Sequence, residues 1–242
     1  MMRAFAHWKA ALVSALVLAL VGAGSAVALP RPVTSFLFGS ALVRADVVVR
    51  AHGDDHLYRV ERGRVRAIGL TAIVLRERDG SNVTVPVASD AALTGVRKGR
   101  AWRGTLLGLR RGMTVATVQD GEEPAERVHV LRPPALPLPP ALLTTLFGDR
   151  MARADLVVQV GTAPTLYRLD RGRIRAIGAT FIVLRERDGT NQTVAVGDDA
   201  VVTGIGRGRL KRGVLAALKR SMVVETVRQG DQPAERIHVV GR

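Results

Sequence analysis

The chain contains no cysteine, and this absence removes several kinds of site at once. Without a thiol there is no disulfide framework, no cysteine nucleophile, no cysteine-ligated zinc and no lipid-modified N-terminal cysteine. Aromatic residues are also scarce, at 4% of the chain. Proteins that bind single-stranded nucleic acids stack the bases on aromatic side chains. The composition therefore argues against sequence-specific recognition of nucleic acid.

Lysine is rare as well, because only four of the 36 cationic residues are lysine and the rest are arginine. Set against 21 acidic residues, they give a formal net charge of +15. Net charge bears on association rather than on fold. The excess predicts either a well-solvated surface or an anionic partner, such as a cell-envelope polymer or lipid headgroups. A protein partner is a further expectation.

The first 28 residues have the pattern of a secretory signal peptide. Residues 1–9 contain two cations and no acid, residues 10–21 are apolar, and residues 26–28 form a small-x-small cleavage site. No twin-arginine pair precedes the apolar run, which favours the general secretion route. We therefore expect an exported, extracytoplasmic protein, secreted or held in the cell envelope. The alternative is an uncleaved signal segment, since residues 10–29 are long enough to anchor the chain in a membrane.

The rest of the chain is a tandem duplication. Residues 37–132 align with residues 146–241 at a constant offset of 109 without a gap, and 53 of the 96 aligned pairs are identical. One supersecondary unit has been duplicated, so both copies should share a fold. We expect a signal peptide (1–28), an N-terminal linker (29–40), a first β-barrel domain (41–132), a proline-rich linker (133–145) and a second β-barrel domain (146–242).

The stretch 75–85, repeated almost unchanged at 184–194, predicts a β-hairpin. Apolar and polar residues alternate on both sides of an Asp-Gly pair. A two-residue loop would mix apolar and polar residues on both faces, whereas a three-residue loop pairs Leu75 with Val83 and gives one apolar face. A slip of one residue moves every side chain to the other face, so burial favours the three-residue loop. Gly80 should then adopt the left-handed conformation.

Turn signals recur every 8–12 residues, and no long amphipathic helix is expected, which is typical of a small β-barrel or sandwich. The expected fold class is all-β, with two tandem OB-like β-barrels of five or six strands each after the signal segment. In the first copy we expect, besides the hairpin, strands at 45–50, 57–60, 64–68, 113–119 and 126–131, a turn or bulge at 61–63, a short helical turn at 90–94, a loop at 96–104 and a helix-compatible stretch at 106–109.

Three segments resemble a known family: Val65-Arg-Ala-Ile, Leu109-Arg-Arg-Gly-Met-Thr-Val and Ala125-Glu-Arg-Val-His-Val. They are similar to an exported bacterial OB-fold-like domain family of unknown function, present here as a tandem duplication. Ser221 departs from the family's glycine at one turn. The resemblance implies an OB-like fold and an exported location, and it brings no activity, cofactor or catalytic residue.

Ladders of arginine are the best functional candidates. Alternation should place them on outer strand faces, where a phosphate- or sulfate-rich polymer would bind mainly through counterion release. The alternative is that the arginines serve cross-strand pairing, with acids such as Glu77 and Glu186 nearby, and solubility. The candidate polyanion-binding residues are Arg64, Arg66, Arg76, Arg78, Arg97, Lys98, Arg100 and Arg103 in the first copy and Arg173, Arg175, Arg185, Arg187, Arg207, Arg209, Lys211 and Arg212 in the second.

Two histidines enclose two carboxylates in the loop from His52 to His56, a combination that suits a transition metal. The second copy has none of these groups at 161–165, so an exposed polar turn is the preferred interpretation. Neither His129 nor His238 has a nucleophile nearby in sequence, and both are expected at the surface, so no hydrolase triad is indicated.

Asp46 and Asp155 are expected to be structural carboxylates that cap a turn or pair with arginine. No catalytic residue, cofactor or metal is expected. The sequence thus predicts a non-enzymatic, exported binding or scaffolding module. The alternatives are an extracytoplasmic nucleic-acid-binding protein and a metal-binding protein that uses the loop from His52 to His56.

Overall fold

The computed structural model describes residues 36–97, 100–131, 138, 140–204 and 215–241. The segment expected to be a signal peptide therefore lies outside the described residues. Strands dominate the described part of the chain, which also contains helix α3 (Pro140–Phe147) and two short 3-10 helices. Among the described residues, none of the helices has the length and apolarity needed to span a bilayer.

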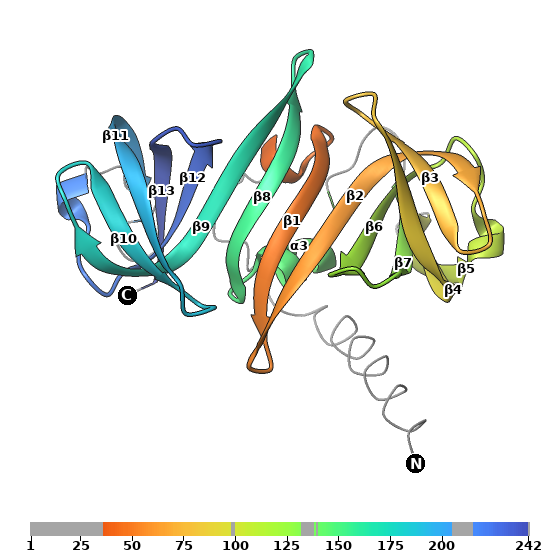
Figure 1. Ribbon diagram of the computed structural model, residues 1–242, viewed down its shortest axis with the longest axis horizontal. Coiled ribbons are helices and arrows are strands. Elements are labelled where there is room, and N and C mark those ends of the chain that lie inside the picture. Colours follow the sequence, from red (N-terminus) through yellow and green to blue (C-terminus); the bar gives the residue numbers. More distant parts are fainter. Residues whose placement is uncertain (1–35, 98–99, 132–137, 139, 205–214, 242) are drawn as a thin grey trace.

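The strands form one mixed sheet of 13 strands, which spans both copies (Figure 1). The first copy contains β1 (Leu42–Ala51), β2 (Asp54–Ile68), β3 (Ala72–Glu77), β4 (Asn82–Arg97), β5 (Arg100–Thr105), η1 (Leu106–Gly108), β6 (Thr114–Asp120) and β7 (Ala125–Leu131). The second contains α3 (Pro140–Phe147), β8 (Met151–Val160), β9 (Ala163–Ile177), β10 (Phe181–Glu186), β11 (Asn191–Thr203), η2 (Leu215–Ala217), β12 (Val223–Gln229) and β13 (Ala234–Gly241).

Five strands of each copy close into a ring. In the first copy the order is β2-β3-β4-β7-β6, and β6 pairs again with β2. In the second copy the order is β10-β11-β13-β12-β9, and β9 pairs again with β10. One pair in each ring is parallel, β4 with β7 and β11 with β13. The ring interiors are lined by alternate residues of these strands, among them Ile73, Leu75 and Val85, each no more than 1% exposed.

The two copies join through the antiparallel pair of β1 and β8, which makes the sheet continuous. Asp46 lies opposite Asp155, and these residues are equivalent in the two repeats. Directly opposed residues of antiparallel strands are related by a two-fold axis perpendicular to the sheet. The junction therefore has local pseudo-two-fold symmetry. This pairing differs from the expectation from sequence, in which the two strands belong to separate barrels.

A core at the junction holds the two copies together. On its symmetry axis the rings of Phe38 and Phe147, again equivalent residues, lie 4.2 Å apart between centroids. Leu37, Leu146 and Val47 are fully buried in the same cluster. Each fully buried side chain of this size contributes about 1.5–3 kcal/mol. The buried faces of β1 and β8, together with α3, thus form a shared core distinct from the two ring interiors.

The hairpin prediction is confirmed in detail. Leu75 pairs with Val83, and the amide of Glu77 donates to the carbonyl of Ser81 at 2.9 Å, which leaves a three-residue loop. Gly80 has a φ of +91°, and the equivalent glycine of the second copy has a φ of +89°. Burial of one strand face therefore selected the register, as expected.

Several expected elements differ from the structure. The helical turn at 90–94 is instead part of β4, which continues to Arg97, and the expected loop at 96–104 is largely the hairpin of β4 and β5. The strands expected at 57–60 and 64–68 belong to the single strand β2, which runs from the junction into the ring. The all-β class is confirmed, and the ring is barrel-like, but a continuous sheet joins the two copies.

Candidate anion-binding faces

The arginine ladders lie on the outside of the rings. On β2, Val65 points into the ring interior, and its neighbours Arg64 and Arg66 are exposed. On β3, Leu75 points inward and Arg76 outward. The second copy repeats the arrangement with exposed arginines at 173, 175 and 185. Strand alternation therefore places these cations in solvent, as predicted.

Two of the arginines in each copy are direct cross-strand neighbours. Arg64 lies opposite Arg76, and Arg173 lies opposite Arg185. The Cβ atoms of directly opposed residues are about 4.5–5.5 Å apart, and like charges in this position are destabilising. Within the described residues no ion pair or side-chain hydrogen bond neutralises any of these four arginines. Each ring thus presents an uncompensated pair of guanidinium groups, a geometry suited to a ligand with closely spaced negative charges.

The acids next to the ladders are directed elsewhere. Glu77, whose side chain is 1% exposed, accepts a hydrogen bond from Arg44 at 2.8 Å, and Asp79 pairs with the same guanidinium at 3.4 Å. Burial pushes the pKa of Asp79 upward, but hydrogen bonds from Ser81 and the charge of Arg44 bring it below its usual value. Arg153 holds the equivalent acids of the second copy in the same way. Within the described residues these glutamates therefore do not pair with the ladder arginines, and the alternative that the ladders only keep the protein soluble stays a prediction.

Sequence reasoning missed a further pair of cations beside each ladder. The turn 110–113 is bound to β2, because the amide of Val65 donates to the carbonyl of Met113 and the amide of Gly112 donates to the carbonyl of Val65, both at 2.8 Å. Arg110 and Arg111 are exposed on this turn, where the guanidinium of Arg110 also donates to the carbonyls of Leu107 and Leu109. Lys219 and Arg220 are exposed at the equivalent positions of the second copy. The sequence did contain a signal for these residues, because two cations stand next to each other at this position in each copy.

The remaining candidate cations are distributed differently. Arg78, Arg103 and Arg187 are all exposed. Arg78 also donates to the carbonyl of Ser40 at 3.1 Å and is therefore engaged by the N-terminal segment. The side chains of Arg97 and Arg100 are outside the described part of the chain. Entirely outside the described residues are Lys98, Arg207, Arg209, Lys211 and Arg212.

The metal candidates do not converge on a shared centre in the described structure. His52 is exposed in a turn with a φ of +54°. His56 instead lies against β6, where its Nδ1 is 2.9 Å from Asp120 and its ring stacks on Tyr58. No group of three or more potential metal-binding side chains occurs among the residues that the structure describes.

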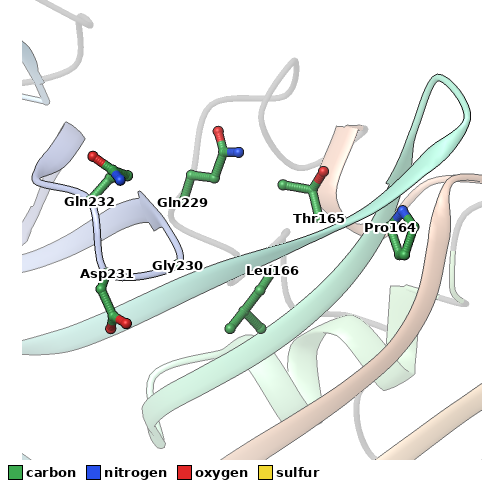
Figure 2. Close-up of a pocket in the computed structure, with 7 residues that line it drawn as sticks. All are labelled: Pro164, Thr165, Leu166, Gln229, Gly230, Asp231 and Gln232. Carbon is green, nitrogen blue, oxygen red and sulfur yellow. The ribbon is translucent and has the colours of Figure 1, made fainter.

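A hollow of about 410 Å³ lies at the start of β9, next to the turn between β12 and β13 (Figure 2). Its lining is mainly uncharged, and its one acid, Asp231, forms an ion pair with Arg168. At the equivalent positions of the first copy stand His56, Asp120 and further acids. The two copies have thus diverged at this end, and neither version provides cations. The lining residues are Pro164, Thr165, Leu166, Gln229, Gly230, Asp231 and Gln232.

The two strand histidines are less exposed than expected. His238 is 9% exposed, and its Nδ1 lies 2.8 Å from the hydroxyl of Thr203; His129 is half-buried and makes the same contact with Thr94. Burial lowers the pKa of both histidines, so the imidazoles are neutral at pH 7. In the second copy Glu225 lies opposite His238, but neither carboxylate oxygen of Glu225 has a hydrogen-bond partner in the described structure. Thr203, His238 and Glu225 are therefore not organised as a proton relay.

Asp46 and Asp155 pair with arginine, as expected. Asp46 lies 3.7 Å from Arg59, and Asp155 lies 3.5 Å from Arg168. Burial raises the pKa of Asp46, and the opposed Asp155 adds to the effect, while Arg59 and Arg44 counteract it.

Comparison of the chain with protein-family models, with curated proteins and with solved structures finds no match.

Proposed function

We propose that this protein is an exported, non-enzymatic binding module of the bacterial cell envelope. It holds an anionic polymer through the arginine faces on the outside of its strand rings. The single observation that supports this best is the opposition of Arg64 and Arg76, repeated as Arg173 and Arg185, without compensating acids among the described residues. Placing like charges side by side costs stability, and a bound polyanion offsets that cost.

We further propose that each ring is OB-like. Numbered along the chain, the five strands of the first ring are β2, β3, β4, β6 and β7, and their spatial order is first-second-third-fifth-fourth. The parallel pair joins the third and fifth strands. This Greek-key order supports the resemblance drawn from sequence.

A non-nucleic polymer is favoured over nucleic acid because stacking platforms are few. The exposed aromatic on the strands of the second ring, Phe181, packs over Gly178, since a Cβ added to that glycine would come within 2.3 Å of the phenyl ring. Tyr58 stacks on His56. OB folds that bind single strands use several aromatic platforms. The arginine faces suit dense charge rather than bases.

Binding to inorganic polyphosphate at increasing salt tests the proposal. We expect affinity to fall roughly tenfold or more between about 50 and 200 mM salt, and dextran not to bind. Substitution of glutamine for Arg64, Arg76, Arg173 and Arg185 should abolish most of the affinity. A matched variant with glutamine at Arg50, Arg59, Arg150 and Arg168 has the same net charge and should bind almost normally.

Two outcomes would contradict the proposal. Equal loss of affinity in both fourfold variants would mean that net charge, not the arginine faces, governs binding. A single-stranded oligonucleotide that binds more tightly than polyphosphate at equal charge would favour the nucleic-acid alternative.

A further inference from the structure

We infer that the chain has two separate polyanion sites at opposite ends of the sheet and bridges two polymer segments. The inference rests on the proposed function and specifies how the site works. The pseudo-two-fold axis between Asp46 and Asp155 relates the two arginine faces. β3 and β10, which contribute to these faces, lie at opposite ends of the long axis of the molecule (Figure 1).

Each face is complete by itself. The first combines Arg64, Arg66 and Arg76 with the turn cations Arg110 and Arg111, all exposed and all from one copy. The second combines the equivalent cations at 173, 175, 185, 219 and 220. Because no side chain is shared, loss of one face should leave the other intact.

The sheet between the faces is electrostatically balanced rather than basic. Arg44 is bound by Glu77 and Asp79, and Arg50 pairs with Asp55 at 2.9 Å. Arg59 is matched by Asp46. In the second copy Arg153 and Arg168 also form ion pairs, each with two acids. A polyanion therefore meets, in the described structure, cations without acidic partners at the two ends and mostly paired cations in the middle, so the faces do not merge into one continuous track.

The separation between the faces also limits which ligands can reach both. From β3 to β10 the sheet passes through β2, β1, β8 and β9, five steps between neighbouring strands. At about 4.8 Å per step this is roughly 24 Å along the sheet. A short oligophosphate occupies one face only. A long polymer can bind at one face while the other face binds a distant segment of it or a second polymer molecule, so the protein links the two.

Two experiments on the full chain test the inference. The first is calorimetric titration with inorganic tetraphosphate. We expect two bound molecules per chain, one in the variant R64Q/R76Q, one in R173Q/R185Q, and none in the combined variant. The second is light scattering with long-chain polyphosphate. The unaltered chain should cross-link the polymer and scatter strongly, whereas either double variant should bind it without cross-linking.

Controls make the outcomes distinct. The variant R50Q/R59Q, which loses the same charge from the balanced middle, should cross-link like the unaltered chain, and R64K/R76K should retain cross-linking. One tetraphosphate per unaltered chain, or cross-linking by a double variant, would overturn the bridging inference while the proposed function stands. Failure of the unaltered chain to bind either probe would overturn both.

Discussion

Glu225 should make the stability of the second copy depend on pH. Its side chain in β12 is 1% exposed, and neither oxygen has a hydrogen-bond partner in the described structure. Its neighbours across the sheet are Arg171 on β9, 3.9 Å away, and His238 on β13. Burial raises its pKa to about 7, although the charge of Arg171 counteracts the rise. The folded protein therefore favours the neutral carboxylic acid.

The sign of the effect follows from this raised pKa. Below about pH 4.5 the carboxyl is protonated in both the folded and the unfolded chain, and it carries no penalty. As pH rises toward 7 the unfolded chain ionises first, and stability falls until the folded-state pKa is passed. A pKa moved from 4.5 to about 7 corresponds to about 3 kcal/mol. Glu61, whose pKa burial raises to about 8, acts in the same direction in the first copy.

Urea unfolding of Glu225→Gln between pH 4.5 and 8 isolates this contribution. The difference in unfolding free energy between the variant and the unaltered chain removes the effect of Glu61, because both proteins contain it. We expect the difference to shift in favour of the variant by about 3 kcal/mol across the range. Burial and the charge of Arg171 lower the pKa of the neighbouring His238, and both proteins contain this histidine. Glu235→Gln, at an exposed position of β13, is the control and should give a flat difference; a flat difference for Glu225→Gln as well would refute the reasoning.

Three further changes test the fold by thermal or urea unfolding. Gly80→Val should destabilise the chain by about 1 kcal/mol or more, because the backbone at this position has a φ of +91°. The atom nearest to an added Cβ, on the side chain of Arg76, is 3.9 Å away, so the cost is conformational rather than steric. An unaltered unfolding midpoint would contradict the turn. Ser221→Gly should stabilise by about 1 kcal/mol, because Ser221 has a φ of +71°, and a loss of stability would contradict this. Phe38→Ala should destabilise by about 3–5 kcal/mol, because it empties the core on the symmetry axis, and a cost below that of one surface substitution would argue against a shared junction core.

Local pattern was enough to predict the hairpin because its determinants are close in sequence. Leu75 and Val83 need to share a buried face, and only a three-residue loop with Gly80 at positive φ allows it. The same alternation placed Arg64 and Arg76 in solvent. Periodicity therefore predicted which side chains are outside the ring.

Periodicity could not predict which charges are neutralised. Glu77 stands between ladder arginines in sequence, yet its partner is Arg44, 33 residues away on a strand that does not pair with β3. The β4 strand was missed for a related reason. It makes a parallel pair with β7 in which Val87 and Ala92, five residues apart, face Ala125 and Arg127, and the polar residues between them resemble a break in the strand. Both features depend on contacts between distant segments.

Nothing in the sequence indicated the junction, whose symmetry brings equivalent residues of the two copies together. A residue on the axis meets its own counterpart, so Asp46 faces Asp155, and each copy provides its own arginine to offset the repulsion. A change at such a position in one copy alters the contact of both copies. Away from the axis no such constraint exists, and some positions there differ in charge. Glu225 stands where the first copy has Ala116, and the two histidines and two aspartates of residues 52–56 have no counterparts at 161–165. The arginine pairs lie away from the axis and yet are present in both rings. Fold symmetry does not require that repetition, and the proposed binding function, which uses both ends of the molecule, predicts it.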